Sequence, residues 1–237
     1  MNKTISVIIP TLNEADCLPV LLDYLLKTKD RELIKEIIIS DGNSSDTTCE
    51  IANQFRILII NNPVACRAKQ MNAGAMQATG DFLFFLHADS FPPFNFIQQV
   101  LHAHTKGFQA GCFRLRFDWD HWFLNLNAWF TRFNINAFRF GDQSLFITKE
   151  FFHRIGGFKE DHVIMEDQEI VYRINKINRF VVLPDFVTTS ARKYRTHEPY
   201  LTQGIFFYLY FAYISGASQS TLQKLYWKLI HEKSIQE

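Results

Sequence analysis

Acidic and polar side chains directly follow three short hydrophobic runs in the first part of the chain. In an open α/β sheet, ligands bind outside the carboxyl ends of the strands, so polar groups there can contact a substrate. For any single turn, a tight turn with a helix cap is the better explanation. Acids at three strand ends of one sheet favour a shared binding site, formed by Pro10, Thr11, Asn13 and Glu14, by Asp41 and Asp46, and by His87, Ala88 and Asp89.

A further acidic group, Glu166, Asp167 and Glu169, stands where a helical pattern begins. A carboxylate in a partly closed pocket is a suitable general base, because it can take the proton of an attacking hydroxyl group. Acids in a first helical turn also stabilise the helix by complementing its dipole, and we assign that role to Glu169. Glu166 and Asp167 are the candidates for acid–base chemistry.

Cationic side chains stand at two positions that suit a phosphate group. Arg67 lies near the start of a predicted helix, where its guanidinium group and the helix N-terminus could both face an anion. Arg192 follows the last predicted strand and could assist a leaving group. His197 lies further on, and as a lone histidine it is better explained by a structural role.

The spacing of apolar residues predicts alternating strands and helices up to about residue 90, which is typical of a parallel sheet with helices on both faces. A helix with Leu18, Leu21, Leu22 and Leu25 on one face follows the first strand. Ser45 or Asp46 could cap the next helix, and Asp46 is better explained by that role. Strands are expected at residues 5–9, 36–40, 57–60 and 81–86, and helices at 51–55 and 65–78.

The second half of the chain concentrates many of the 24 phenylalanines. We expect strands at 113–117, 144–147 and 180–183, an aromatic helix at 122–133 and another helix near 167–174. Asp142 and Gln143 lie between the aromatic helix and the next strand, and either a pocket lining or a turn explains them. Residues 204–216 are apolar on all sides and poor in Lys and Arg, which favours burial in the core or in a homodimer interface over peripheral contact with a membrane.

Composition excludes several classes of protein. The 25 basic and 24 acidic side chains nearly cancel, so the broad cationic surface of a nucleic-acid-binding protein is absent. The four cysteines lack C-x-x-C spacing, so neither a disulfide framework nor a thiolate zinc site is expected. We find no signal peptide pattern and no apolar run long enough to cross a bilayer, and we expect a cytoplasmic protein, with contact at the inner face of the membrane as an alternative.

In their order along the chain, these motifs resemble glycosyltransferase family 2: Pro10-Thr-Leu-Asn-Glu14, Asp41-Gly-Asn-Ser-Ser-Asp46, His87-Ala-Asp89 and Met165-Glu-Asp167. The resemblance implies the α/β fold called GT-A, a Rossmann-like, mostly parallel sheet flanked by helices, here with an aromatic helical C-terminal region. It also implies transfer of a sugar from a nucleotide donor with inversion. Motifs at 67–74, 141–143 and 190–193 are similar to a subgroup of small members described as arsenosugar-biosynthesis-like or radical-SAM/selenodomain-associated transferase 2.

On this resemblance, Glu14 and Asp41 would bind the nucleoside, Asp167 would be the general base, and Glu166 would orient it or the acceptor. A diphosphate leaving group requires neutralisation of its charge, which a divalent metal, Mn²⁺ or Mg²⁺, provides when carboxylate oxygens hold it. Asp89 is the expected protein ligand. His87 stands where the family's Asp-x-Asp motif has its first acid, and it could contact the ribose or reach the metal through water.

We therefore expect a single GT-A domain over residues 1–237, with a nucleotide-binding half at 1–90 and an acceptor-binding half at 91–237. The expected donor is a UDP-sugar, and the acceptor is an unknown sugar, lipid or small molecule. A nucleotidyltransferase is disfavoured, because the loop after the first strand lacks the glycines and the cation that cradle a triphosphate. A non-catalytic binding module on a degenerate fold is the alternative, favoured by His87 and opposed by Glu166 and Asp167.

Overall fold

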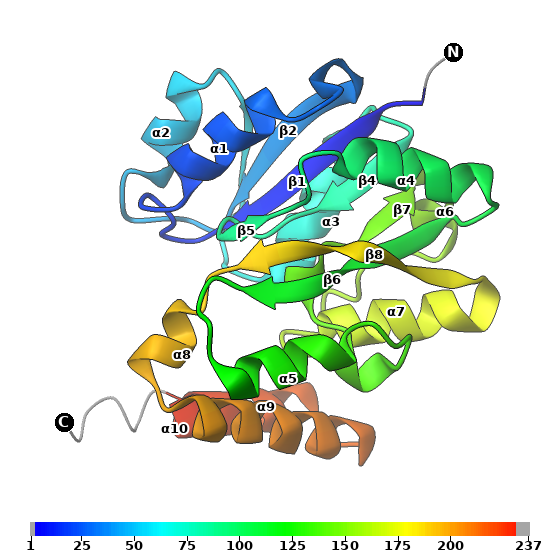
Figure 1. The fold of residues 1–237 in the computed structure, drawn as a ribbon. Coiled ribbons are helices and arrows are strands. Elements are labelled where there is room, and N and C mark those ends of the chain that lie inside the picture. Colours follow the sequence, from blue (N-terminus) through cyan, green and yellow to red (C-terminus); the bar gives the residue numbers. More distant parts are fainter. Residues whose placement is uncertain (1–2, 231–237) are drawn as a thin grey trace.

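The computed structural model describes residues 3–230, and its centre is one sheet of eight strands (Figure 1). The strands lie in the order β3-β2-β1-β4-β7-β6-β8-β5. Within the described residues, β5 and β7 are antiparallel to their neighbours and the other pairings are parallel, so the mostly parallel sheet is confirmed. The strands are β1 (Ile5–Thr11), β2 (Ile34–Asp41), β3 (Leu58–Asn61), β4 (Phe82–Phe85), β5 (Ser90–Phe91), β6 (Ala110–Phe117), β7 (Phe146–Thr148) and β8 (Phe180–Thr189).

Helices cover both faces of the sheet. On one face lie α1 (Leu18–Lys27), α2 (Thr48–Gln54) and α4 (Phe96–Thr105). On the other face lie α3 (Arg67–Gln77), α6 (Lys149–Arg154) and α7 (Glu166–Ile177). Short 3-10 turns, η1 (Arg31–Leu33), η2 (Asn136–Phe138) and η3 (Gly141–Gln143), complete the connections.

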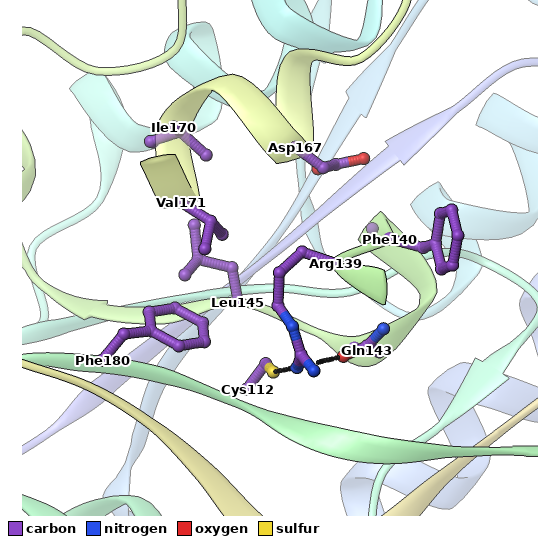
Figure 2. A pocket seen from close by; sticks show the side chains of 10 residues that line it. Cys112, Arg139, Phe140, Gln143, Leu145, Asp167, Ile170, Val171 and Phe180 are labelled. Carbon is purple, nitrogen blue, oxygen red and sulfur yellow. Dashed lines mark hydrogen bonds between the residues drawn. The ribbon is translucent and has the colours of Figure 1, made fainter. Parts of the chain in front are cut away.

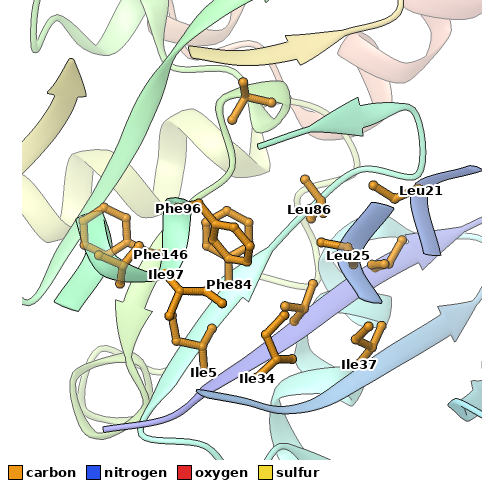
Figure 3. Packing of buried hydrophobic residues seen from close by; sticks show 14 of the residues in the cluster. Ile5, Leu21, Leu25, Ile34, Ile37, Phe84, Leu86, Phe96, Ile97 and Phe146 are labelled. Atoms are coloured by element: carbon orange, nitrogen blue, oxygen red, sulfur yellow. The ribbon is translucent and has the colours of Figure 1, made fainter. Parts of the chain in front are cut away.

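The core on the first face shows why the apolar spacing predicts these elements. Leu18, Leu21, Leu22 and Leu25 recur at helical spacing, and all are fully buried in α1. Figure 3 shows α1 leucines above the strands, in a cluster that also contains aromatic side chains of β4 and α4. Burial of each leucine side chain stabilises the fold by about 2 kcal/mol.

Strand β8 extends well beyond the predicted strand, which ended at residue 183. Pro184 interrupts the strand pattern, because proline lacks the N–H group that a sheet ladder needs. The pairing with β6 skips Pro184 and the residue after it, and resumes at Phe186. The strand therefore continues to Thr189. The short strand β5 and the helices α4 and α6 were also not predicted.

The C-terminal helices form a separate layer at the end of β6 and β8, drawn in orange and red beside the green α5 in Figure 1. This layer contains α5 (Trp122–Phe130), α8 (Arg192–Thr196), α9 (Pro199–Ile214) and α10 (Gln219–Ile230). Residues 204–216 are expected in the core or in a homodimer interface. One side of α9 lies in the core, with Ile205 and Leu209 buried, and the other side, with Tyr208 and Phe211, is exposed on the single chain. Within residues 3–230, no helix is long and apolar enough to cross a membrane.

The sheet brings distant segments to one edge. The carboxyl ends of β1, β2 and β4 meet there, as predicted from the sequence. Because β7 is antiparallel to both β4 and β6, strands β6 and β8 end at the same edge. The segment before β7, which contains η3, lies at this edge for the same reason.

Candidate active site

A cavity of about 540 Å³ opens at this edge, between the strand ends and the C-terminal helices. Its volume lies in the range of small-molecule binding sites. Most of the predicted site residues line it: Pro10, Thr11, Glu14, Arg67, His87, Ala88, Asp89, Asp142, Asp167 and Arg192. The fold therefore brings the motifs of both halves of the chain together around one space.

Asp41 and Asn13 are not among the residues that line the cavity. The Asp41 carboxylate is 2% exposed and accepts hydrogen bonds from Thr11 Oγ1 at 2.8 Å and from Ser44 Oγ at 2.6 Å. Asn13 Oδ1 accepts from the backbone N–H of Ser45 at 2.8 Å. These bonds join the turns after β1 and β2. The nucleoside contact of Asp41 stays a prediction, and a ligand would share this carboxylate with the chain's own donors.

Two other acids, for which we predicted structural roles, are engaged by the chain itself, although the N-cap residue of α2 is Thr47 rather than Ser45 or Asp46. Asp46 Oδ1 accepts from the N–H of Thr48, the first residue of α2, at 3.0 Å. Glu169 lies 2.6 Å from Arg173 Nη2 and 3.0 Å from Lys159 Nζ. Burial alone would raise the pKa of each acid, but hydrogen bonds outweigh it and lower both pKa values.

Arg192 connects the turns after β1 and β4. Its Nη2 atom donates to both carboxylate oxygens of Glu14, at 2.6 and 2.8 Å, and lies 3.4 Å from Asp89 Oδ2. Arg192 is the first residue of α8, directly after β8, so the parallel pairing of β6 and β8 places it here. The residue predicted to assist a leaving group thus contacts the acids predicted to hold the nucleoside and the metal. His197 is not among the cavity-lining residues.

Asp89 can supply one carboxylate to a metal ion. Burial raises the pKa of Asp89, and the nearby charge of Asp142 adds to this effect. Its oxygens are the kind of ligand that Mn²⁺ and Mg²⁺ accept. In the part of the chain that the structure describes, no group of three or more His, Cys, Asp or Glu side chains is arranged to hold a metal ion. A metal ion held by Asp89 would have to take its other ligands from a bound phosphate compound and water.

His87 and Asp142 form a hydrogen-bonded pair, with 2.8 Å between Nδ1 and Oδ1. Burial disfavours the charged form of each group. The hydrogen bond and the opposite charges outweigh burial, so they raise the pKa of His87 and lower the pKa of Asp142 to about 2. The position of the expected first acid of the motif is therefore occupied by an imidazole held by Asp142.

Glu166 lies behind the cavity wall, next to Arg67. Its carboxylate is 1% exposed, and Oε1 is 2.8 Å from Arg67 Nε, a charge contact without the alignment of a hydrogen bond. Burial raises the pKa of Glu166 to about 7; Arg67 opposes this shift and Asp167 adds to it. The guanidinium group of Arg67 is about half exposed, in the cavity. Glu166 thus contacts a cation that faces the cavity, rather than the cavity itself.

Gly141 separates Asp167 from His87. A Cβ atom built on Gly141 would lie 2.6 Å from Asp167 Oδ2 and 2.6 Å from His87 Nε2. A side chain at residue 141 would therefore displace one or both of them. The absence of a Cβ atom lets the start of α7 approach the turn after β4.

Gln143 lies in a small pocket with Arg139 (Figure 2) and is not among the residues that line the large cavity. Arg139 is 2% exposed and donates from Nη1 to Gln143 Oε1 at 2.6 Å. Its Nη2 atom donates to the carbonyl oxygens of Thr131, at 2.6 Å, and of Phe133. Gln143 in turn donates to the carbonyl of Phe138. Of the two interpretations left open for Gln143, a pocket lining or a turn, these contacts favour the turn.

The sequence patterns did not single out several residues of the site. Arg139 is one of two cations in the aromatic segment at 122–140, the other being Arg132. Gln70 lines the cavity one helical turn after Arg67, and its Nε2 atom donates to the carbonyls of Thr11 and Ser40, each at 2.8 Å. Tyr194 lines it too and donates to Gln203 Oε1 of α9 at 3.0 Å. Its position depends on the packing of α8 against α9, which no local pattern indicates.

The end of the cavity away from the acids is largely apolar. Its walls come from β6, the residues before α7, and helices α9 and α10, and include Leu115, Phe117, Met165, Phe206, Leu209 and Trp227. Asn127, Gln203 and Gln223 add amide groups at this end. The cavity therefore has a charged end at the strand termini and an apolar end beneath the C-terminal helices.

Comparison with known families matches residues 6–183 to the family described as Glycosyl transferase family 2. The chain belongs to this family. Among curated members, it is 39% identical over 90 residues to a PGL/p-HBAD biosynthesis glycosyltransferase of Mycobacterium bovis, covering 35% of this chain and 34% of that protein. It is 33% identical over 131 residues to undecaprenyl-phosphate 4-deoxy-4-formamido-L-arabinose transferase of Proteus mirabilis, covering 52% of this chain and 40% of that protein. The match thus spans less than half the length of each of these two relatives.

Solved structures confirm the α/β GT-A fold of the family 2 chain. Mannosyltransferase PcManGT from Pyrobaculum calidifontis, in complex with GDP-Man and Mn²⁺, matches with a TM-score of 0.71 at 17% identity, over 99% of this chain and 70% of that one. S. aureus TarS 1–349, in complex with UDP-GlcNAc, matches with a TM-score of 0.67 at 18% identity, over 79% of this chain and 58% of that one. The family and fold predicted from the motifs are confirmed.

Proposed function

We propose that this chain transfers a sugar from a nucleoside diphosphate donor, a UDP-sugar in the simplest case, to a hydroxyl group of an acceptor, with inversion. The observation that supports this is the cavity itself. It has acids and cations from several strand ends at one side and an apolar, amide-bearing surface at the other. The TarS structure, whose description names UDP-GlcNAc, supports the choice of uridine.

The donor's nucleoside and diphosphate would occupy the charged end, within the nucleotide-binding half at residues 1–90. Pro10, Thr11, Glu14 and Ala88 line that end, and Asp41 lies directly behind Thr11. Arg67 and Arg192 would contact the phosphates, because both guanidinium groups face the cavity. On donor binding, Arg192 would exchange part of its contact with Glu14 and Asp89 for the diphosphate.

Asp89 would hold a divalent cation, Mn²⁺ or Mg²⁺, together with the donor. When bound, this ion neutralises the negative charge that develops on the diphosphate leaving group. The His87–Asp142 pair lies near Asp89, and because the imidazolium and the carboxylate cancel, the pair would add no net charge beside the same oxygens. The PcManGT structure, described with GDP-Man and Mn²⁺, supports a metal in this fold.

Asp167 would act as the general base. Asp167 lines the cavity between its charged end and its apolar end. Its Oδ2 atom lies close to the backbone of Gly141 and to the ring of His87. A carboxylate there can accept the proton of an acceptor hydroxyl as that oxygen attacks the anomeric carbon. Glu166 would orient the site from behind, through its contact with Arg67.

The acceptor would bind in the half formed by residues 91–237, at the apolar end. We treat residues 1–237 as a single domain, because both halves contribute to one sheet and one cavity. One relative is named for transfer to undecaprenyl phosphate, and another for PGL biosynthesis. An acceptor with an apolar portion next to its hydroxyl group fits this lining. The cytoplasmic location and the membership in the arsenosugar-biosynthesis-like subgroup stay predictions.

The experiment that tests the proposal measures release of nucleoside diphosphate from a panel of nucleotide sugars, with Mn²⁺ or with EDTA. We expect turnover of at least one donor with Mn²⁺. Asp167→Asn should lower turnover by about 100-fold or more, because it removes the base, while calorimetry shows nearly unchanged donor affinity.

The rival hypothesis is a non-catalytic nucleotide-sugar-binding module on the same fold. It predicts donor binding without turnover of any donor on a broad panel of acceptors. The His87 substitution in the metal motif is the feature that favours it. An equal low background in the wild-type protein and in Asp167→Asn would contradict the enzymatic proposal and support the module.

A further inference from the structure

Helix α9 presents one apolar side to the solvent. Leu201, Tyr208 and Phe211 are spaced by seven and three residues, so they lie on the same side of the helix. Tyr208 is 53% exposed and Phe211 is 61% exposed. The helix contains no charged residue from Pro199 to Ile214. A surface helix of a protein that is surrounded by water normally places polar side chains on this side.

Helix α5 has a similar exposed side. Trp122, Leu126 and Trp129 recur at helical spacing, and Trp122 is 64% exposed. This helix also contains no charged residue. Tyr200 of α9 joins the two helices, since its ring centroid lies 6.1 Å from that of Trp122. We call the exposed side chains of both helices the aromatic face: Trp122, Leu126, Trp129, Leu201, Tyr208 and Phe211.

Cationic side chains border the aromatic face. The guanidinium group of Arg132 lies 4.4 Å from the ring centre of Trp129. Helix α10, which packs against α9, contains Lys224 and Lys228 and no acidic residue. Helix α8 adds Arg195, whereas its Lys193 lines the cavity. Among residues 3–230, the acids in the neighbouring turns are Asp118, Asp120 and Glu198, and Asp118 is paired with Arg195 at 3.3 Å.

We propose that the aromatic face docks on the surface of an anionic lipid bilayer. Tryptophan and tyrosine side chains favour the boundary between lipid headgroups and acyl chains, because each has an apolar ring and a polar atom. The surrounding lysines and arginines complement negatively charged headgroups. Phosphate headgroups would also contact Lys224 and Lys228, which form no ion pair with another described residue.

A second copy of the chain fits this face less well. In a dimer with two-fold symmetry the same patch meets itself, so the bordering cations of one copy would approach those of the other. An anionic bilayer brings the opposite charge to the same cations. The chemistry of the border therefore favours the bilayer as the occupant.

Docking in this orientation would connect the bilayer to the cavity. Phe206 and Leu209 of α9 line the apolar end of the cavity, while Tyr208 and Phe211 of the same helix belong to the aromatic face. The two sides of α9 thus contact different surroundings. Membrane docking is independent of the proposed sugar transfer, because it requires no turnover.

The test is co-sedimentation of the full chain with vesicles of phosphatidylcholine alone or of phosphatidylcholine and phosphatidylglycerol in equal parts. We expect binding to the anionic vesicles that weakens at high salt. The double variant Tyr208→Ser, Phe211→Ser should lower this binding by about tenfold or more. The matched control is Val20→Ser, Met76→Ser, which removes exposed apolar side chains from α1 and α3 and should bind like the wild-type protein.

Thermal unfolding of both double variants, followed by circular dichroism, confirms that each is folded, and UDP binding reports the cavity separately. Absence of wild-type binding to anionic vesicles would overturn the proposal, as would equal binding by the Tyr208/Phe211 variant. A concentration-dependent dimer in light scattering that this variant abolishes, without vesicle binding, would assign the face to a second copy instead.

Discussion

At the scale of single residues, the geometry of the site depends on Gly141, which leaves room for the side chains of His87 and Asp167. His87, Asp142 and Asp167 belong to three segments far apart in sequence, and they meet around Gly141. The Cβ atom that every other residue carries would contact Asp167 and His87 at 2.6 Å. The positions of the proposed base, Asp167, and of the His87 imidazole therefore both depend on this glycine.

We expect Gly141→Ala to lower turnover by about 100-fold, because a displacement of roughly 1 Å at reacting groups has an effect of this size. The free energy of unfolding should change much less, since the ends of two side chains can move. Steady-state kinetics with the best donor measures the effect. Gly204→Ala is the control, because a Cβ atom there meets nothing within 4 Å. Equal turnover in the two variants would contradict the positioning role of Gly141.

At the scale of elements, η2 and η3 have little regular structure of their own and are held by Arg139. This buried guanidinium group donates to Gln143 and to the carbonyls of Thr131 and Phe133. Among the described residues, no carboxylate forms an ion pair with Arg139. Its hydrogen bonds to neutral acceptors fix the segment that carries Gly141 and Asp142 into the site.

Arg139→Met keeps a similar volume but removes the donor to the Thr131 carbonyl and one of the donors to Gln143 Oε1 and to the Phe133 carbonyl, which still accept from Cys112 Sγ and from the Ile135 N–H. A buried acceptor left without a donor costs about 1–3 kcal/mol. We expect a total loss of about 2–4 kcal/mol in the free energy of unfolding, measured by urea denaturation. Donor turnover at low temperature should fall as well, because Asp142 loses its support. Arg179→Met, at an exposed arginine stacked on Phe108, should change stability by less than about 1 kcal/mol. Similar stabilities for the two variants would show that Arg139 does not hold this segment.

At the scale of the whole molecule, the buried acid Glu166 links stability to pH. Burial raises its pKa from 4.5 to about 7 in the folded chain. Between these values the folded state keeps a proton that the unfolded state has lost. The contribution of Glu166 to stability is therefore fully present below pH 4.5 and is lost as the pH rises through 7.

Glu166→Gln removes this dependence. The melting temperature of the variant minus that of the wild-type protein should increase as the pH rises from about 4 to about 8. The increase corresponds to at most about 3 kcal/mol, or several degrees for a chain of this size. Scanning calorimetry over this pH range measures the two melting temperatures. Because all other titrating groups are the same in both proteins, their effects cancel in the difference between the two melting temperatures. A pH-independent difference would show that Glu166 titrates normally.

The sequence by itself determined the local elements and the motifs. Leu18 and Leu25 mark a helix, and the buried strands before Asp41 and Asp89 mark a parallel sheet, because both periodicities are visible within a few residues. The family follows from the same short motifs. The alternation in β6 likewise predicted its buried and exposed sides.

Only the tertiary structure decided which of these residues share a space. Whether Arg192 reaches Glu14 depends on the parallel pairing of β8 with β6, between strands that are far apart in the chain. The burial of Glu166, the role of Gln143 and the exposure of Tyr208 depend on packing between elements in the same way. Sequence periodicity records which side of an element is apolar. It does not show which other element packs against that side, because this packing depends on contacts between segments that are distant in the sequence.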